Sequence, residues 1–208
     1  NAADANLNTA AFDRGGVLWF TGQAGYYGRL DPKSGAMRVF EAPGGSGPYG
    51  TTATPAGEIW FVSLAGSYLA HIDRATGKPE VVATPQKGDG ARRVWSDSKG
   101  DLWVSLWNVG KLARFAPATR QWKTWPLPGD LSRAHQEVLV TQASNLQLTV
   151  TDKRAQAKGD TYGVGAVYRS TDAGNTWTTA GEGLPAVAVL QLSVTDDGQI
   201  LASMEGRG

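Results

Sequence analysis

Cysteine is absent from the 208 residues, and histidine and methionine occur only twice each. Without cysteine the sequence has no disulfide, no thiolate nucleophile and no Cys-ligated metal. Apolar runs near 18 residues are also missing, so neither a transmembrane helix nor membrane insertion is predicted. Apolar spacing typical of helices is scarce, which leaves many short strands as the expected structure.

The charges of the chain nearly cancel. Lysine and arginine number 20 and the acidic residues 19, for a formal net charge of +1. This balance produces no field that would attract nucleic acid or an anionic membrane surface. A phosphate-cradling glycine loop is lacking as well, so no nucleic-acid partner is predicted. Glycine is nevertheless frequent, with 27 residues, and eight tryptophans occur, which suits short strands joined by tight turns.

One short pattern occurs three times: a glycine, two further residues and a tryptophan, continued by a β-rich run. It lies at residues 16–21, 57–62 and 100–105, and its tryptophans, Trp19, Trp60 and Trp103, are 41 and 43 residues apart. A nearly fixed period of this length is typical of repeat architectures. Each repeat is expected to be one supersecondary unit whose apolar faces are covered by its neighbours.

Each of the first three repeats divides into four short segments separated by turns that contain glycine or proline. The segments expected to be strands are 10–13, 17–21, 28–31 and 37–41, then 51–54, 59–63, 70–73 and 80–84, then 93–96, 102–106, 111–115 and 123–125. Four antiparallel strands with one aromatic landmark predict the blade of a β-propeller. In such a ring Trp19, Trp60 and Trp103 would fill the core between blades.

The sequence changes character after Gly129. We therefore divide it into residues 1–129, three similar blades, and residues 130–208, further blades expected to belong to the same propeller. Strands are predicted at 135–142, 146–151, 166–169, 187–195 and 200–204. The predicted fold class is all-β, a propeller of about five four-stranded antiparallel blades, the last incomplete. An incomplete ring has an open edge that the N-terminal strand, further chain or a partner must cover.

Residues 7–128 resemble the streptogramin B lyase (virginiamycin B lyase) family. The resemblance rests on residues 47–50 (Gly-Pro-Tyr-Gly), 55–61 (Pro-Ala-Gly-Glu-Ile-Trp-Phe) and 70–73 (Ala-His-Ile-Asp), with support from 29–35 and 125–128. It implies a propeller fold and, for the namesakes of the family, a ring-opening C–O eliminase that uses a magnesium ion. It also implies an exported protein, periplasmic or extracellular.

Residues 166–177 resemble the Asp-box repeat of sialidase-type (BNR) propellers, Ser-x-Asp-x-Gly-x-Thr-Trp. The pattern positions are filled by Ser170, Asp172, Gly174, Thr176 and Trp177. The resemblance implies a structural hairpin in which Asp172 bonds local backbone amides, Gly174 makes the turn and Trp177 packs inside. No cluster of arginines around paired carboxylates accompanies the motif, so it does not by itself indicate a glycosidase.

The start of the first strand and the end of the second lie at the same end of each blade, because the two strands are antiparallel. These positions from all blades meet at one mouth of the central channel, where a propeller would bind a ligand. The predicted ligand-binding residues are Asn8, Gln23, Tyr49, Ser63, Arg92, Arg93, Trp107 and Asn108. Arginine and aromatic side chains suit an anionic or aromatic ligand, or a partner protein.

The lyase resemblance implies a catalytic histidine at the start of a first strand and a glutamate just after a second strand. The first three repeats lack this pair at those positions. Continuing the period from Arg92 by 43 residues reaches His135, while Asp152 and Glu205 follow the second strands of the fourth and fifth repeats. A histidine beside a carboxylate would act as a general base with its orienting or metal-binding partner. The alternative is an isolated loop histidine, and His71 is interpreted as an ordinary polar-face residue.

Three functions remain open. The favoured one is a non-catalytic propeller that binds a partner protein or a small-molecule ligand at its channel mouth. The second is a magnesium-dependent lyase-like enzyme that uses His135 with Asp152 or Glu205. The third is an Asp-box protein that binds or processes carbohydrate.

Overall fold

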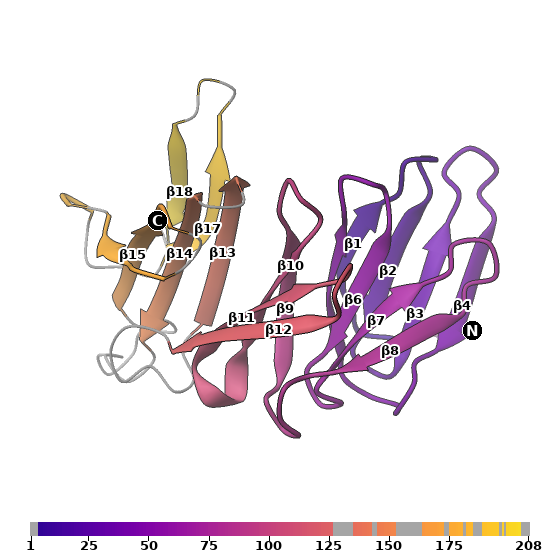
Figure 1. Cartoon of the computed structure of the whole chain (residues 1–208). Coiled ribbons are helices and arrows are strands. Elements are labelled where there is room, and N and C mark those ends of the chain that lie inside the picture. Colours follow the sequence, from indigo (N-terminus) through magenta and orange to yellow (C-terminus); the bar gives the residue numbers. More distant parts are fainter. Residues whose placement is uncertain are drawn as a thin grey trace.

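The computed structural model describes residues 4–126, 135–142, 145–152, 164–172, 175–180, 182–184, 189–195, 197 and 199–204. Within these residues the protein is almost entirely β (Figure 1), with one short 3₁₀ helix, η1 (Trp107–Val109). The strands form four four-stranded sheets and one two-stranded sheet, each antiparallel and built from consecutive strands. The predicted all-β fold is therefore confirmed. No helix of the described part is long and apolar enough to cross a membrane.

The first three sheets correspond to the three similar repeats. The first contains β1 (Leu7–Phe12), β2 (Leu18–Gly22), β3 (Tyr26–Leu30) and β4 (Met37–Glu41). The second contains β5 (Pro48–Ala53), β6 (Ile59–Ser63), β7 (Tyr68–Ile72) and β8 (Pro79–Ala83). The third contains β9 (Ala91–Ser96), β10 (Leu102–Leu106), β11 (Lys111–Ala116) and β12 (Gln121–Pro126).

The last two sheets lie in the second half of the chain. The fourth contains β13 (His135–Gln142), β14 (Asn145–Asp152), β15 (Val164–Ser170) and the two-residue strand β16 (Thr178–Thr179). The fifth contains β17 (Val189–Val194) and β18 (Ile200–Met204). The fifth sheet is thus half of a blade among the described residues, as predicted.

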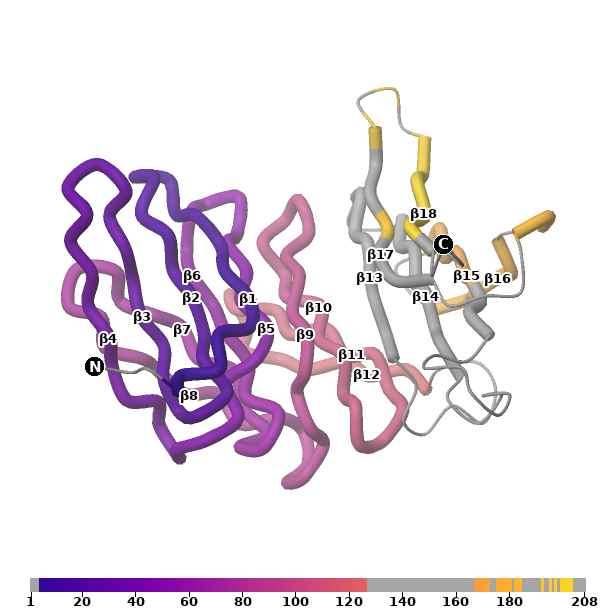
Figure 2. The backbone as a smooth tube through the Cα atoms, turned by 180° about the vertical axis from the view of Figure 1, so that it is seen from behind, coloured from indigo at the N-terminus to yellow at the C-terminus, as the bar shows by residue number. Residues whose placement is uncertain are grey.

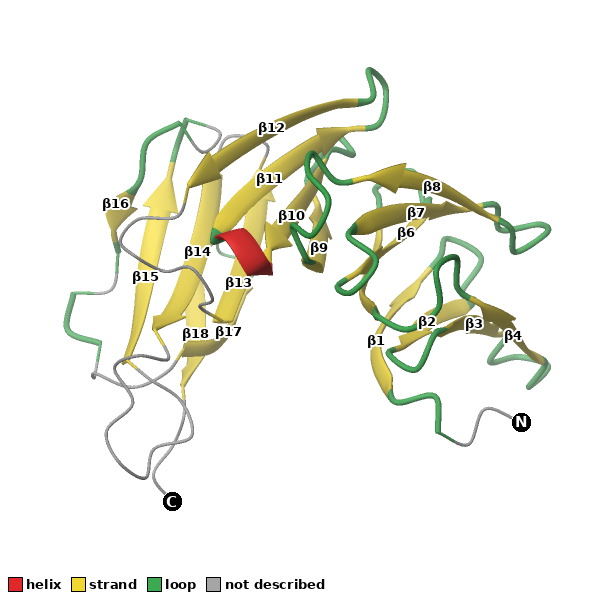
Figure 3. Cartoon of the chain, turned by 90° about the horizontal axis from the view of Figure 1, so that it is seen from below, coloured by secondary structure: helices red, strands yellow, loops and turns green. Residues whose placement is uncertain are grey.

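The sheets follow one another along an arc, with the first sheet at one end and the fourth and fifth sheets at the other (Figures 1 and 3). The first strand of each sheet contacts the first strand of the next, in the order β1, β5, β9, β13, β17, and the later strands of each sheet lie farther out (Figure 2). This is the arrangement of β-propeller blades around a central axis. The ends of the first strands therefore line the channel.

The repeated tryptophans occupy the core between blades. Trp19, Trp60 and Trp103 are 1%, 4% and 0% exposed, which confirms the packing predicted from the period. Trp19 belongs to a buried cluster with Tyr27 of its own blade and Phe61 of the next. The rings of Tyr27 and Phe61 stack with centroids 5.1 Å apart. Side chains of alternate residues thus join the second blade to the first and to the third.

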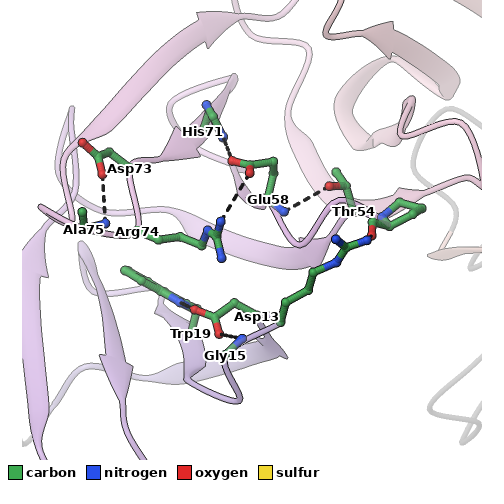
Figure 4. Close-up of polar contacts among 11 residues, drawn as sticks. Asp13, Gly15, Trp19, Thr54, Glu58, His71, Asp73, Arg74 and Ala75 are labelled. Carbon is green, nitrogen blue, oxygen red and sulfur yellow. Dashed lines mark hydrogen bonds and ion pairs between the residues drawn. The ribbon is translucent and has the colours of Figure 1, made fainter.

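The hairpin that carries each tryptophan depends on an unusual backbone conformation. Gly16, Gly57 and Gly100 have φ values of 79°, 79° and 86°, the left-handed region that glycine enters without a steric penalty. In the first blade, Asp13 accepts hydrogen bonds from the amides of Gly15 and Val17 and from Nε1 of Trp19 (Figure 4). The hairpin therefore fixes both the turn and the tryptophan ring.

The outward face of the first blade is apolar and open. Cross-strand pairing places Phe12, Leu18, Leu30 and Met37 in one row across the sheet. Phe12 is 58% exposed and Met37 63%. The corresponding face of the second blade carries Ile59, which is fully buried against the first blade. The first blade therefore has an apolar face that the described residues leave exposed.

The turn after β15 is held by a carboxylate. Asp172 accepts hydrogen bonds from the amide of Thr176 at 2.8 Å, from the Thr176 hydroxyl at 2.6 Å and from the Ser170 hydroxyl at 2.8 Å. The bond to a local backbone amide was expected, whereas Trp177 is half-buried rather than fully packed inside. Gly174, the expected turn residue, lies outside the described residues.

We predict that this turn loosens in acid. Hydrogen bonds from the hydroxyl and amide of Thr176, and to a smaller extent from the Ser170 hydroxyl, lower the pKa of Asp172 from its ordinary 3.8 to about 2. Because the folded pKa is the lower one, the stabilisation is complete above about pH 4 and is lost as the pH falls through about 2. Protection of the Thr176 amide from hydrogen exchange, measured against its intrinsic exchange rate at the same pH, should therefore fall in acid. Asp172→Asn should remove this pH dependence, and an unchanged profile in that variant would contradict the assignment.

Candidate ligand-binding site at the channel mouth

A β-bulge lies at the start of the first strand in each of the first three blades. Pairing slips by one residue between Leu7 and Ala10, between Pro48 and Thr51, and at Arg92. These bulges extend the first strands up to three residues before their predicted starts. A bulge leaves a residue unpaired and redirects its side chain, and bulges are frequent beside functional sites. The predicted mouth residues Asn8, Tyr49 and Arg92 occupy them.

The structure brings four of the predicted residues together around one guanidinium group. The Cζ atom of Arg92 lies 4.9 Å from the ring centroid of Tyr49 and 4.4 Å from that of Trp107. Arg92 also donates a hydrogen bond from NH2 to the Tyr49 hydroxyl at 3.0 Å. Arg93 places its Cζ 5.4 Å from the same Tyr49 ring. Cations at these distances over aromatic faces are attracted by the ring quadrupole.

The phenol of Tyr49 reports the positive charge of this cluster. Burial alone would raise its pKa, because it disfavours the phenolate. The charge of Arg92, hydrogen bonds from Asn8 and Arg92, and the charge of Arg93 outweigh burial, so the pKa of Tyr49 lies below its ordinary value of 10.0. The mouth therefore favours a negative group. The same contacts show that Asn8, although exposed, belongs to the cluster.

The main chain of Tyr49 is held from the first blade. The hydroxyls of Thr9 and Thr21 both donate to the Tyr49 carbonyl, at 2.6 and 2.5 Å. Thr21 is buried, so one of these bonds is shielded from water. The position of the Tyr49 ring is thus set by residues of three blades. They lie on β1 of the first blade, on β5 of the second, and on β9 and η1 of the third.

Gly50 allows the second and third blades to approach at this point. A Cβ atom at Gly50 would lie 2.9 Å from the Arg93 Cα and the Val94 amide nitrogen, and 3.0 Å from the Arg92 carbonyl oxygen. All three are backbone atoms, which cannot move aside as a flexible side chain would. Gly50 therefore keeps β5 close to β9 and places Tyr49 against the two arginines.

We predict that Gly50→Ala lowers the free energy of unfolding by about 2 kcal/mol, as overpacking of a tight contact does. The added methyl must push β5 away from β9, so the pKa of Tyr49 should also rise toward its ordinary value. Denaturant unfolding measures the first effect and a phenol NMR titration the second. Thr52→Ala, on the same strand, is the control and should cost less than about 1 kcal/mol. Equal effects of the two substitutions would show that the close approach is unimportant.

The remaining predicted mouth residues have other contacts. Ser63 is fully buried, and its hydroxyl accepts a hydrogen bond from the Gly66 amide at 3.0 Å, so it supports the turn after β6. Asn108 is exposed and donates to the Gly88 carbonyl at 2.9 Å. Gln23 accepts a hydrogen bond from Asn6 at 3.3 Å. The structure therefore places these three at the same ends of the strands, but these side-chain hydrogen bonds go to other partners than the Tyr49 cluster.

The structure describes the backbones of two of the three predicted catalytic residues, His135 and Asp152. His135 begins β13 and pairs with Thr151, so the backbones of His135 and Asp152 lie at the same end of the β13–β14 hairpin. The register shift of this pair lies between Val140 and Gln142, not at the start of β13, so His135 differs in backbone geometry from Asn8, Tyr49 and Arg92. Glu205 lies outside the described residues. Among the described residues no three His, Asp or Glu side chains are grouped to hold a metal ion.

A second polar cluster, which the sequence analysis missed, lies at the opposite end of the second blade (Figure 4). His71 Nε2 is 2.8 Å from Glu58 Oε2, and Arg74 NH2 is 3.5 Å from Glu58 Oε1. The His71 ring stacks on Trp60 with centroids 4.6 Å apart. Glu58, Trp60 and His71 border a cavity of about 360 Å³ between the second and third blades, which is lined on its far side by Lys99, Asp101, Pro117, Ala118 and Arg120.

The Glu58–His71 pair follows a regular structural pattern. Cross-strand pairing sets Trp19 opposite Arg29, Trp60 opposite His71 and Trp103 opposite Arg114. The guanidinium carbons of Arg29 and Arg114 lie 5.7 and 6.0 Å from the paired rings. Each blade thus covers its tryptophan with a basic side chain, and the interpretation of His71 as a polar-face residue in this series agrees with its position. The signal for the ion pair was the acidic residue directly after the motif glycine in the second repeat.

The fold and the arrangement of the sheets define this chain as a β-propeller. It is similar to virginiamycin B lyase from Staphylococcus aureus, with 17% identity over 98% of this chain and 78% of that chain, at a TM-score of 0.64. It is also similar to a catalytically inactive variant of that lyase with quinupristin (18% identity, 99% and 79%, TM-score 0.57) and to YCF48 bound to D1 peptide (17% identity, 91% and 58%, TM-score 0.62). No family model and no curated protein matches the sequence. At these identities the likeness shows the fold alone.

Proposed function

We propose that this propeller binds a small ligand or a segment of a partner protein at its channel mouth, without chemical conversion. The observation that carries the proposal is the convergence of Asn8, Tyr49, Arg92, Arg93 and Trp107 from three blades. Aromatic and arginine side chains dominate binding hot spots, since they combine large contact area with directed hydrogen bonds. Two propellers of similar fold have bound quinupristin and a D1 peptide, respectively, which supports a binding role for this architecture.

Comparative capture from native extract tests the proposal. The wild-type chain and the double variant Arg93→Gln/Trp107→Ala serve as baits, and bound proteins and small molecules are identified by mass spectrometry. A species retained by the wild type, at a stoichiometry near one, and lost by the variant supports binding at the mouth. Equal recovery by both baits, or none by either, would refute it. Circular dichroism of the variant establishes that its fold is retained.

A lyase-like enzyme is the second candidate, because the β13–β14 pairing brings His135 and Asp152 to one end of the hairpin. We propose for it that His135 acts as a general base on a cyclic ester and that Asp152 or Glu205 orients it. Magnesium-dependent turnover that His135→Ala abolishes would support the enzyme. Absence of turnover, or turnover unchanged in that variant, would remove it.

The 170–177 segment is proposed to be an Asp-box with a structural role, on the basis of the three hydrogen bonds to Asp172. A carbohydrate function would need a glycan ligand, and an array without binding would eliminate it. Export to the periplasm or the cell exterior stays a prediction from the lyase resemblance, and fractionation of native cells would test it.

A further inference from the structure

We infer that the ligand of the channel mouth carries a carboxylate and that Arg93 binds it. This inference rests on the proposed binding function and assigns the chemical class of the ligand. The observation behind it is a buried side-chain donor that lacks a hydrogen-bond acceptor. The Nε atom of Arg93 is buried and has no hydrogen-bond partner among the described residues. A buried donor without an acceptor is costly, and such groups in native structures call for an explanation such as an absent ligand.

Other arginines of the first three blades show what Arg93 lacks. Five of them donate to a backbone carbonyl or pair with a carboxylate, namely Arg14 with the Pro55 carbonyl, Arg29 with the Arg74 carbonyl at 2.9 Å, Arg74 with Glu58, Arg114 with Asp101, and Arg120 with Glu80. Arg93 pairs with no carboxylate in the described part of the chain, and its guanidinium is instead held over the Tyr49 ring. Its charge is therefore left for an external anion.

The surroundings hold the Arg93 guanidinium in place for such an anion. Its backbone amide donates to Ser105 Oγ at 3.0 Å, and the contact at Gly50 fixes its Cα. The Arg92 guanidinium also lies over the Tyr49 ring, and its Cζ atom is 4.4 Å from the ring centroid of Trp107. Two cations beside one ring produce the positive potential that the lowered pKa of Tyr49 reports. A preorganised guanidinium loses little conformational freedom on binding.

The geometry favours a carboxylate over a phosphate. A guanidinium presents parallel donors that match the two oxygens of a planar carboxylate. A phosphate dianion is usually held by several backbone amides of a helix start or glycine-rich nest. The described part of the mouth begins no α-helix, since η1 is a single 3₁₀ turn, and in the glycine-rich loop before β5 the amides of Gly45 and Gly47 already donate to the Ala42 and Gln23 carbonyls. One arginine with an unpaired Nε–H, supported by a second positive charge, suits a single negative charge.

The direct test is NMR of the arginine Nε–H groups in the whole chain during titration with benzoate. Benzamide, which has the same shape without the charge, and phenyl phosphate are the comparison probes. We expect benzoate to shift the Arg93 Nε–H signal with saturation in the millimolar range, as for simple monoanions, while benzamide does not bind. Equal shifts with benzamide, stronger binding of phenyl phosphate, or no response to benzoate would each overturn the inference.

Variants separate the role of Arg93 from a general charge effect. Arg93→Gln should weaken benzoate binding about tenfold or more, the loss typical of a charge-assisted hydrogen bond, and Arg93→Lys should recover only part of it. Arg38→Gln, which removes an exposed arginine of β4, is the matched control and should leave binding unchanged. Equal losses in Arg93→Gln and Arg38→Gln would contradict the assignment. If an Arg93 variant does not fold, the wild-type titrations still decide the result.

The source of the carboxylate is resolved by a second pair of probes. A short N-acetylated peptide with a free C-terminus is compared with the same peptide as its C-terminal amide. Much tighter binding of the acid peptide than of benzoate indicates a polypeptide terminus, and equal affinities indicate a small acid. Failure of all carboxylates, while comparative capture still depends on the mouth residues, would overturn this inference and leave the proposed binding function standing.

Discussion

Trp103→Ala is expected to lower the free energy of unfolding by about 4 kcal/mol, within the 3–5 kcal/mol typical of a buried aromatic removed to alanine. Trp103 is fully buried, stacks on Trp125 with centroids 5.4 Å apart, and donates from Nε1 to Asp97 at 3.1 Å. The substitution removes a large apolar surface, a ring contact and a buried hydrogen bond together. The substitution would leave a cavity at a fully buried position on an inner strand of the third sheet, and the surrounding strands cannot readily close it.

Denaturant unfolding followed by circular dichroism measures this loss. Trp107→Ala is the control, since Trp107 is also a tryptophan of the third blade but is half-buried on η1. It should cost less than about 1 kcal/mol, in the range of a substitution outside the core. If the two variants lost equal stability, the repeated tryptophan would not be the main contact between blades.

Asp97→Ala is expected to cost about 3 kcal/mol. Asp97 is 2% exposed and accepts hydrogen bonds from the amides of Lys99 (2.9 Å) and Asp101 (3.0 Å) as well as from Nε1 of Trp103. Removal of the carboxylate leaves these donors without their acceptor, and each buried unsatisfied donor costs roughly 1–3 kcal/mol. Part of the loss is recovered by water at the amides, which lie nearer the surface.

The matched control is Asp13→Ala, which removes the same three bonds in the first blade. Asp13 is half-buried, so water replaces more of its hydrogen bonds and the cost should be clearly smaller. Equal costs would show that burial does not set the strength of the hairpin.

Asp97→Asn provides a further measurement. Burial first, and then the charge of Asp97, raise the pKa of Asp101 above its ordinary 3.8. Neutralising Asp97 should therefore lower the pKa of Asp101, which carboxyl NMR would detect. An unchanged pKa of Asp101 would contradict the proposed repulsion between the two carboxylates.

The gathering of Tyr49, Arg92 and Trp107 follows from a rule that sequence alone supplies. Once three units are aligned at 41- and 43-residue spacing, antiparallel pairing places the start of one strand beside the end of the next. The same rule placed Ser63 and Asn108 at this end of the blades, yet both are engaged by local turns. Position along a strand is periodic, whereas the contacts of a side chain depend on neighbours from other blades.

The ion pair of Glu58 with His71 is a contact that the sequence period did not predict. The two residues are thirteen positions apart. Glu58 directly precedes β6 and His71 lies near the end of β7, and the repeat pattern does not relate these two positions. Their contact requires the third strand to fold back across the second, with Trp60 beneath the imidazole. The sequence period identified each strand, but it did not identify which side chains of neighbouring strands contact one another.

By itself, the sequence determined the all-β class, the four-stranded repeat and the burial of Trp19, Trp60 and Trp103. These features depend on local turn chemistry and on a period that any stacking of the units must satisfy. The tertiary structure decided the β-bulges, the close approach at Gly50 and the unpaired Nε of Arg93. Such features arise where blades meet in space, because strand curvature and the distance between sheets set them, and a single repeat contains neither.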